Sequence, residues 1–198
     1  MNEVTLATLT AELQQSLGDS KEYFVEQEPR LLQLALDDYS KYCPRRLDDE
    51  LLLVSSTQQY DLPDDFIGFY STSWGNSNAP LWQSGRPANA PRFITSKDVL
   101  TLRFTRPITA ADLQYFGCVF HYQYHARHCF NDAGVLTTVD DPNLIILRAQ
   151  AEAMNELSLH LAMKRSSASA NVSAPATNER PASLYRTLMD EFKERVNA

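Results

Sequence analysis

The chain has 198 residues, of which 43% are hydrophobic and 22% are charged, and its formal net charge is −7. A chain of this length buries roughly 70% of the surface that its unfolded form exposes, so the composition predicts a folded protein and excludes disorder of the whole chain. The acidic balance argues against tight DNA binding, because that affinity comes mainly from Lys and Arg side chains that neutralise phosphates.

Three cysteines occur in the chain: Cys43, Cys118 and Cys129. Their number and spacing fit neither a disulfide framework nor a zinc motif, so we expect a reducing compartment. The first 18 residues lack a basic region followed by an apolar stretch, which predicts no secretory signal. No apolar run approaches the ~18 residues of a membrane-spanning helix, so we expect no membrane association.

Two helices are expected at the start of the chain. Four leucines recur at helical spacing: Leu6, Leu9, Leu13 and Leu17. Gly18 provides a stop signal for this first helix. The second helix is expected to begin at Pro29, which suits a first helical position, and to end near Cys43, because Pro44 disfavours helical conformation in the residue before it.

The sequence then becomes β-prone. We expect strands over five ranges: 50–56, 66–74, 93–95, 99–104 and 115–128. Within the last range, five apolar or aromatic residues alternate and so share one face: Phe116, Cys118, Phe120, Tyr122 and Tyr124. The stretch 75–92 is rich in Gly, Pro, Asn and Ser, which predicts a long irregular loop.

The helical period returns after residue 139. Asp140 or Asp141 can cap a long helix whose first turn contains Pro142 and which ends near Lys164-Arg165. The range 166–182 is expected to be a flexible linker. A terminal amphipathic helix follows, with these residues on its apolar side: Leu184, Tyr185, Leu188, Met189, Phe192 and Val196. This side can pack on the chain's own core or bind in a groove of another subunit.

This element order predicts an α+β fold, with a helical bundle core, an inserted small antiparallel β-sheet or open barrel, and a C-terminal helical arm. The predicted parts are N-terminal core helices (1–49), a β insert with a long loop (50–130), a long core helix (131–165), a linker (166–182) and a docking helix (183–198).

Histidines are the strongest candidates for chemistry. His121 and His125 would share one face of a strand but lie roughly 13 Å apart at ~3.3 Å per residue, too far to share a metal ion without another ligand. His128 would lie on the opposite face, beside Cys129. We therefore favour solvent-facing or hydrogen-bonded strand histidines over a metal site.

The charged and aromatic candidates also have structural explanations. Carboxylates at 48–50, 64–65 and 140–141 fall at predicted element boundaries, where they serve as caps and turn formers more often than as acid–base pairs. Arg45 and Arg46 could contact phosphate, although ion pairs with the neighbouring Asp48 and Asp49 are a simpler explanation. Two tryptophans could stack on a ligand, but an interface or core position is favoured for both: Trp74 and Trp82.

Established catalytic motifs are absent from the sequence. It contains no glycine-rich phosphate loop, Gly-x-Ser-x-Gly, His-Glu-x-x-His or Cys-x-x-Cys. We therefore expect neither an enzyme nor a bound cofactor.

Several short motifs are similar to those of one family. The residues Tyr39-x-x-Tyr42-x-Pro44-Arg45 and Gln59-Tyr60-Asp61-Leu62-Pro63-x-Asp65-Phe66 resemble the head-to-tail adaptors, or head completion proteins, in the neck of tailed bacteriophages. The Tyr-rich stretch 120–124 and Thr137-Thr138-Val139-Asp140-Asp141-Pro142, which opens a helix, continue the similarity. The resemblance extends over residues 28–165.

The resemblance implies a structural virion protein that assembles in the bacterial cytoplasm. Such adaptors form a dodecameric ring below the portal protein, around the channel through which the genome passes without sequence-specific binding, and they receive the next neck or tail component. The implied portal-docking residues are those of the terminal helix: Leu184, Tyr185, Leu188, Met189, Phe192 and Val196. Candidate contacts with neighbouring subunits or the tail are Arg45, Arg46, Trp74 and Trp82.

Two alternatives remain open at this stage. The chain could be another virion protein of the neck, such as a stopper or tail-completion protein, because these also lack catalytic residues. It could instead be a small metal- or ligand-binding domain or enzyme that uses the loop 75–92 and the histidine strand.

Overall fold

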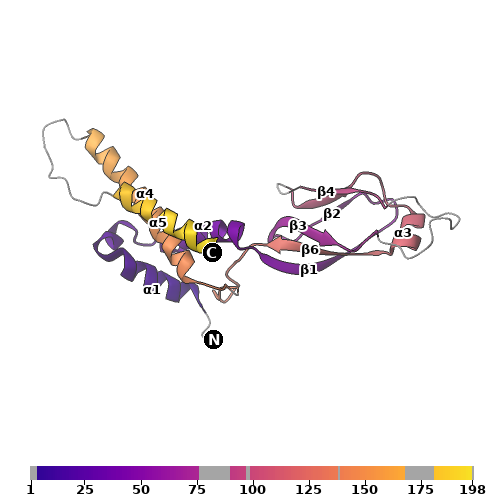
Figure 1. Ribbon diagram of the computed structural model, residues 1–198, viewed down its shortest axis with the longest axis horizontal. Helices are drawn as coiled ribbons and strands as arrows, with labels where there is room; N and C mark the ends of the chain where they lie inside the picture. Colours follow the sequence, from indigo (N-terminus) through magenta and orange to yellow (C-terminus); the bar gives the residue numbers. More distant parts are fainter. Residues whose placement is uncertain (1–3, 76–89, 97–98, 138, 168–180, 198) are drawn as a thin grey trace. The chain divides into compact units, whose positions relative to one another are not determined.

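The computed structural model describes residues 4–75, 90–96, 99–137, 139–167 and 181–197 (Figure 1). The chain divides into two compact units. Unit 1 joins Met1–Cys43 to His128–Ala198, and unit 2 is formed by Pro44–Arg127. Each unit has its own cluster of buried hydrophobic residues, so each is held together by a separate core.

Unit 1 is helical in its described residues. Its elements are α1 (Leu6–Leu17), the 3-10 helix η1 (Gly18–Tyr23), α2 (Glu28–Tyr42), α4 (Asn143–Ser167) and α5 (Pro181–Val196). A capping box between Thr5 and Thr8 starts α1. The helix α2 begins one residue before the predicted Pro29, which lies in its first turn. The Asp141 carboxylate accepts a hydrogen bond from the Asn143 backbone N–H where α4 begins.

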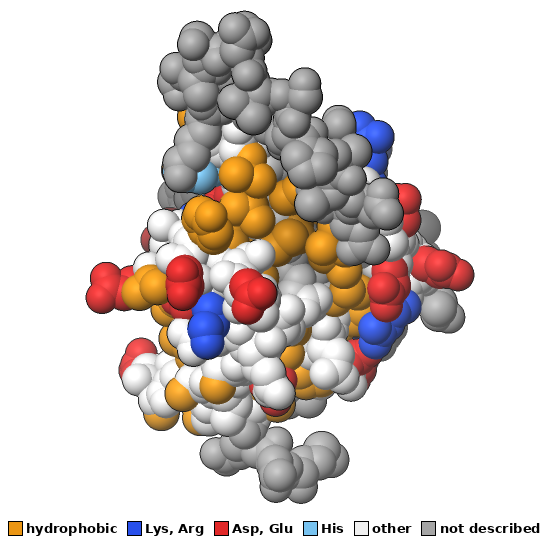
Figure 2. Space-filling model, turned by 90° about the vertical axis from the view of Figure 1, so that its left-hand side faces the viewer, with side chains coloured by type: hydrophobic (Ala, Val, Ile, Leu, Met, Phe, Trp, Pro, Cys, Tyr) orange, Lys and Arg blue, Asp and Glu red, His pale blue; other side chains and the backbone are white. Residues whose placement is uncertain are grey.

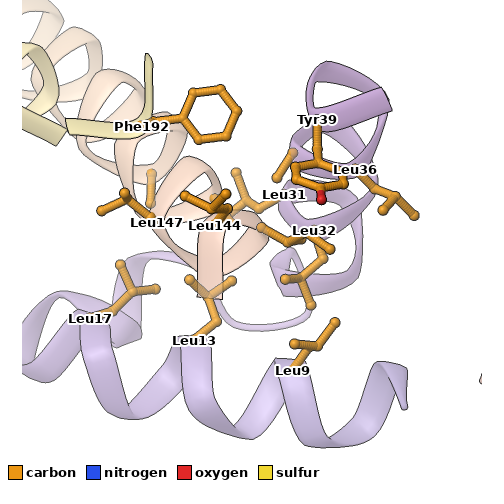
Figure 3. Packing of buried hydrophobic residues seen from close by; sticks show 14 of the residues in the cluster. Leu9, Leu13, Leu17, Leu31, Leu32, Leu36, Tyr39, Leu144, Leu147 and Phe192 are labelled. Atoms are coloured by element: carbon orange, nitrogen blue, oxygen red, sulfur yellow. The ribbon is translucent and has the colours of Figure 1, made fainter. Parts of the chain in front are cut away.

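The core of unit 1 is rich in leucine. Figure 3 shows leucines of α1, α2 and α4 gathered around one interior, with Tyr39 of α2 and Phe192 of α5 beside them. The buried leucines of α1 are those whose spacing predicted the helix: Leu9, Leu13 and Leu17. Phe192 is fully buried, so α5 contributes to this core in the same way as the other helices.

The apolar side of α5 therefore packs within its own unit. Five residues of that side are partly buried against the core: Leu184, Tyr185, Leu188, Met189 and Val196. Phe192 also contacts the Tyr42 ring edge-to-face, with 5.8 Å between ring centroids. Of the two positions that the sequence left open for the terminal helix, the single chain adopts the one on its own core.

Unit 2 contains six strands and one short helix in the part of it that the structure describes. They are β1 (Arg45–Leu52), β2 (Gln59–Asp61), β3 (Phe66–Thr72), β4 (Phe93–Ser96), β5 (Thr101–Phe104), α3 (Ala110–Phe116) and β6 (Val119–Ala126). They form two antiparallel three-stranded sheets, ordered β1-β6-β3 and β2-β5-β4. Within this unit Figure 1 shows the sheets as two layers.

Aromatic side chains fill the space between the two sheets. The Phe120 ring of β6 lies edge-to-face against Phe93 of β4, at 5.3 Å, and Phe104 of β5, at 5.8 Å. Alternate residues of β6 share this interior: Phe120, Tyr122, Tyr124 and Ala126. Because successive side chains of a strand point to opposite faces, the residues between them lie on the outer face of the sheet.

The helical bundle core with an inserted small sheet or open barrel was a wrong prediction, although the α+β class is right. The strands form two sheets, and these enclose a second core that shares no residue with the helical core of unit 1. The reason is the aromatic content of the β segment, which is large enough to bury a hydrophobic interior between two layers.

Several element boundaries also differ from the predictions, and two of the differences are large. The first strand begins at Arg45 rather than residue 50, so the carboxylates 48–50 lie within a strand and not at its boundary. The segment Ala110–Phe116 is helical, and the strand expected from residue 115 begins at Val119. Trp82, most of the loop 75–92 and linker residues 168–180 lie outside the described residues.

The helix α3 is fixed by a buried carboxylate. Asp112 forms a capping box with Thr109 and accepts two hydrogen bonds from the Arg106 guanidinium, at 2.6 and 2.8 Å. Its side chain is fully buried. Burial alone would raise the pKa of Asp112, but the hydrogen bonds from Arg106 and Thr109 outweigh it and lower the pKa to about 2.

This shift predicts an acid-sensitive contribution to the stability of unit 2. Because the pKa of Asp112 is lower in the folded state than its ordinary value of 3.8, the contribution is present above pH 3.8 and is lost as the pH falls toward 2. It amounts to roughly 2 kcal/mol. Asp112→Asn should therefore flatten the pH dependence of unfolding between pH 4 and 2 in urea titrations, whereas an unchanged slope would contradict this assignment.

No helix of the described residues is long and apolar enough to cross a membrane.

Candidate functional site

The chain passes between its two units twice, at Cys43–Pro44 and at Arg127–His128. Beside both crossings, each unit has its own group of residues whose side chains and backbone atoms form several hydrogen bonds. We call the group in unit 1 the histidine clamp (Ser40, Cys43, His128 and Thr137) and the group in unit 2 the arginine clamp (Arg45, Asp65, Tyr124 and Arg127).

The histidine clamp joins the end of α2 to the returning chain. The His128 ring is buried, and its Nε2 lies 2.8 Å from the Cys43 carbonyl oxygen. Since a carbonyl only accepts, Nε2 carries the proton, and Nδ1 can accept from the Thr137 hydroxyl at 3.3 Å. The buried Ser40 hydroxyl accepts from the His128 backbone N–H and donates to the Leu36 carbonyl. His128 is therefore not on the strand face where the sequence placed it.

Tyr39 lies against the histidine clamp. Its ring contacts the His128 ring edge-to-face, with 5.3 Å between centroids. Burial, supported by the nearby Cys43 and Asp140, raises the pKa of Tyr39 to about 12. This tyrosine is thus a neutral packing residue at physiological pH, and it gives no base for catalysis.

The arginine clamp holds both crossings on the side of unit 2. The Arg45 guanidinium donates to the Asp65 carboxylate at 2.9 Å and to the Arg127 carbonyl at 3.0 Å. The Tyr124 hydroxyl donates to the other Asp65 oxygen at 3.0 Å. The Arg127 backbone N–H donates to the Asp65 carbonyl. Burial, and then the hydrogen bond to Asp65, raises the pKa of Tyr124 above its ordinary value.

The arginine clamp brings together residues from three separate sequence motifs. Arg45 belongs to the motif that ends α2, Asp65 to the motif around β2, and Tyr124 to the Tyr-rich strand. Sequence reasoning paired Arg45 with Asp48 and Asp49 instead. Nothing in a one-dimensional pattern links Arg45 to Asp65, because the pairing depends on how β1 and β3 both align with β6.

The outer face of the β1-β6-β3 sheet carries the two strand histidines. His121 lies 3.4 Å from Glu50, and both side chains are about two-thirds exposed. His125 contacts the Tyr70 ring edge-to-face at 5.3 Å, while the Arg46 guanidinium lies 3.8 Å over that ring. No group of three or more His, Cys, Asp or Glu in the described part of the chain could hold a metal ion.

An acidic hollow of about 530 Å³ is lined by the middle residues of β1 and β6 and by the end of β3. Carboxylates of Asp48, Asp49 and Glu50 line it, together with Ser71, Thr72, Ser73, His121, Tyr122 and Gln123. Two of the carboxylates are engaged: Asp49 accepts from the Tyr122 hydroxyl and Asp48 from the Gln123 amide. The hollow is therefore a polar surface with internal partners, and it does not have the arrangement of an acid–base pair.

Unit 1 has an apolar groove of about 420 Å³ between η1 and the second half of α4. Its lining includes the exposed side chains Tyr23 and Leu159, and His160 contacts Tyr23 edge-to-face. Figure 2 shows hydrophobic side chains gathered on this end of unit 1, with Asp and Glu side chains around them. Such a surface is typical of a protein contact.

The remaining predicted contact residues have different positions. Trp74 is only 9% exposed and lies in the core of unit 2, where its indole N–H donates to the Gly117 carbonyl. Arg46 is exposed on the sheet, and Arg45 is part of the arginine clamp. Trp82 lies outside the described residues.

Comparison with known proteins gives no match. No family model matches this chain. No curated protein matches it either.

Proposed function

We propose that this chain is a structural virion protein: a head-to-tail adaptor that forms a ring below the portal of a tailed phage and connects capsid to tail. The observation that carries the proposal is the convergence of the resemblance motifs. Three of them, distant in sequence, contribute Arg45, Asp65 and Tyr124 to one hydrogen-bonded cluster. A joint structural role explains why these short motifs occur together.

The distribution of apolar surface supports the proposal. Unit 1 carries the groove around Tyr23 and Leu159, and unit 2 carries exposed aliphatic side chains at Leu52 and Ile94. An adaptor needs separate surfaces for at least two partners, and exposed apolar residues on each unit can provide them. In this proposal the partners are the portal protein, neighbouring copies of the chain and the next neck or tail component.

Because α5 is already packed in unit 1, it can bind the portal protein through its apolar side only if it first leaves that position. Its apolar side is packed on α4, and Phe192 is fully buried. If this side binds the portal protein, contacts with the portal must replace those with α4, because an exposed Phe192 loses its burial free energy of about 1.5–3 kcal/mol. The adaptor is then a protein whose terminal helix exchanges one hydrophobic partner for another.

The test is to mix the purified chain with a portal protein from the same genome and to follow binding by gel filtration. We expect a complex that elutes ahead of both components. The substitution Phe192→Ser should weaken this complex if the apolar side of α5 takes part in binding. The control is Lys193→Ser on the exposed side of α5, which should leave the complex unchanged. A folded chain that never co-elutes with the portal would contradict the proposal.

A further inference from the structure

The two sheets of unit 2 have opposite outer faces. Their inner faces pack on one another through Phe93, Phe104 and Phe120. The outward residues of the β1-β6-β3 sheet and those of the β2-β5-β4 sheet therefore point away from each other. A second molecule can contact each of these faces without competing for the other.

The outer face of β1 is acidic and ends in an exposed leucine. Leu47 and Leu51 contact the core, so Asp48, Glu50 and Leu52 are the outward residues of this stretch. Leu52 is 67% exposed, and Glu50 is paired across the strands with His121. We call Asp48, Glu50 and Leu52 the acidic face. Arg46 lies on the same side, but its guanidinium is stacked on the Tyr70 ring.

The outer face of the other sheet is basic around an exposed isoleucine. Ile94 of β4 is 64% exposed and lies directly opposite Arg103 of β5, which is also exposed. Arg92 is exposed and two residues before Ile94, so it shares this side. We call Arg92, Ile94 and Arg103 the basic face. One described acidic residue, Asp61 of β2, also lies on this side. It is paired with Thr101 of β5, two residues along that strand from Arg103.

The charges of the basic face have no partner within the described residues. Neither guanidinium, of Arg92 or Arg103, takes part in an ion pair there. On the acidic face, Glu50 has only the exposed His121 at 3.4 Å. Each face thus combines an exposed aliphatic side chain with charges of one predominant sign, and the two signs are opposite.

We infer that unit 2 binds a second copy of this chain, with the acidic face of one molecule against the basic face of the next. The complementary surface for each face is present on the same chain, which is why the occupant is a copy. Leu52 and Ile94 would give the contact an apolar centre, and the carboxylates and guanidinia would fix its orientation. Such a contact joins different surfaces, so it can be repeated from subunit to subunit into a closed ring.

The inference rests on the proposed function in one respect, since it takes the contact between unit 2 faces to be the one that joins subunits of the adaptor ring. It also goes further, because it names the surfaces and predicts association without a portal. The association should weaken when the salt concentration rises from ~0.05 to ~0.5 M, since exposed charges are screened over shorter distances at high salt.

Two charge-swapped chains test the contact. Arg92→Glu/Arg103→Glu makes both faces acidic, and Asp48→Lys/Glu50→Lys makes both faces basic. In sedimentation velocity at low salt, each variant alone should associate at least about tenfold more weakly than the unaltered chain. An equimolar mixture of the two should recover the association, because every contact between unlike variants is again complementary.

A control and a fold check accompany these variants. Glu12→Lys/Asp19→Lys changes two exposed charges of unit 1 by the same amount and should associate as the unaltered chain does. Recovery in the mixture also excludes misfolding as the cause of the loss, since a misfolded chain would not be rescued by mixing.

Three results would overturn the inference: an unaltered chain that stays monomeric over the whole concentration series, charge variants that associate normally, or a mixture that fails to recover. The adaptor proposal fails separately. Charge-dependent association of a chain that never binds the portal protein would leave the contact standing and remove the adaptor function. If the chain forms a ring on the portal and neither charge-swapped variant changes this, the adaptor function stands and the proposed contact is wrong.

Discussion

Phe120→Ala is expected to lower the free energy of unfolding of unit 2 by about 3–5 kcal/mol and to leave unit 1 protected. Phe120 is fully buried and contacts aromatic rings of both sheets, Phe69 of β3 and Phe93 and Phe104 of the opposite sheet, so its removal leaves a cavity between them. The two hydrophobic clusters share no residue, and the loss should therefore stay within unit 2. Amide hydrogen exchange measured residue by residue would record this loss in β5 and β6 and unchanged protection in α2 and α4.

Phe192→Ala provides the reciprocal measurement. This substitution in the core of unit 1 should lower the protection of α4 and α5 amides from hydrogen exchange by a similar amount. The amides of the strands in unit 2 should stay as protected as before. Tyr70→Ala is the control, because this aromatic residue is 46% exposed and lies outside both clusters. Equal losses in both units from either core variant would show that the units unfold together and would contradict the separation into two cores.

Removal of residues 167–198 is expected to destabilise unit 1 by more than Phe192→Ala alone. The truncation removes all of α5, including Phe192 and the partly buried Leu188 and Met189. It also exposes the surface of α4 that these residues cover. Thermal unfolding followed by circular dichroism should show a lower midpoint for the helical signal, together with faster proteolysis of α4.

The matched control for the truncation is Lys193→Ala/Glu194→Ala on the exposed side of α5, which should change stability by no more than about 0.5 kcal/mol. A truncated chain as stable as the full one would show that α5 does not belong to the core of unit 1. It would instead favour an arm that is free to bind a partner at no cost in stability.

The helices at the start of the chain could be predicted from local signals. Leucine spacing gave the buried side of α1, and Pro29 and Pro44 marked the limits of α2, which runs from Glu28 to Tyr42. Both signals act within a few residues, where helix geometry and proline stereochemistry determine the outcome.

The helix α3 was missed because of an overlapping alternation. Phe116 and Cys118 continue the pattern of Phe120, Tyr122 and Tyr124, so the strand was predicted to begin too early. A capping signal at Thr109 and Asp112 could have located this helix, since a hydroxyl followed three residues later by a carboxylate starts helices. Gly117, with a φ of 90°, ends it.

The division of strands into two sheets could not be predicted from the sequence. Alternation shows which side of a strand is apolar, but it does not show which strands pair. For the same reason the Arg45–Asp65 ion pair and the placement of charges on opposite outer faces became visible only in the structure. The position of α5 was likewise undetermined, because an amphipathic helix is equally suited to its own core and to a partner's groove.

The proposal that this chain is a ring-forming adaptor between a portal and a tail is tested most directly by electron microscopy of the chain mixed with a portal protein from the same genome. We expect a ring of copies in direct contact with the portal, with unit 2 of each subunit against unit 2 of the next. A ring separated from the portal by another protein would instead identify a stopper. Portal particles that remain bare beside a folded, monomeric chain would contradict the account.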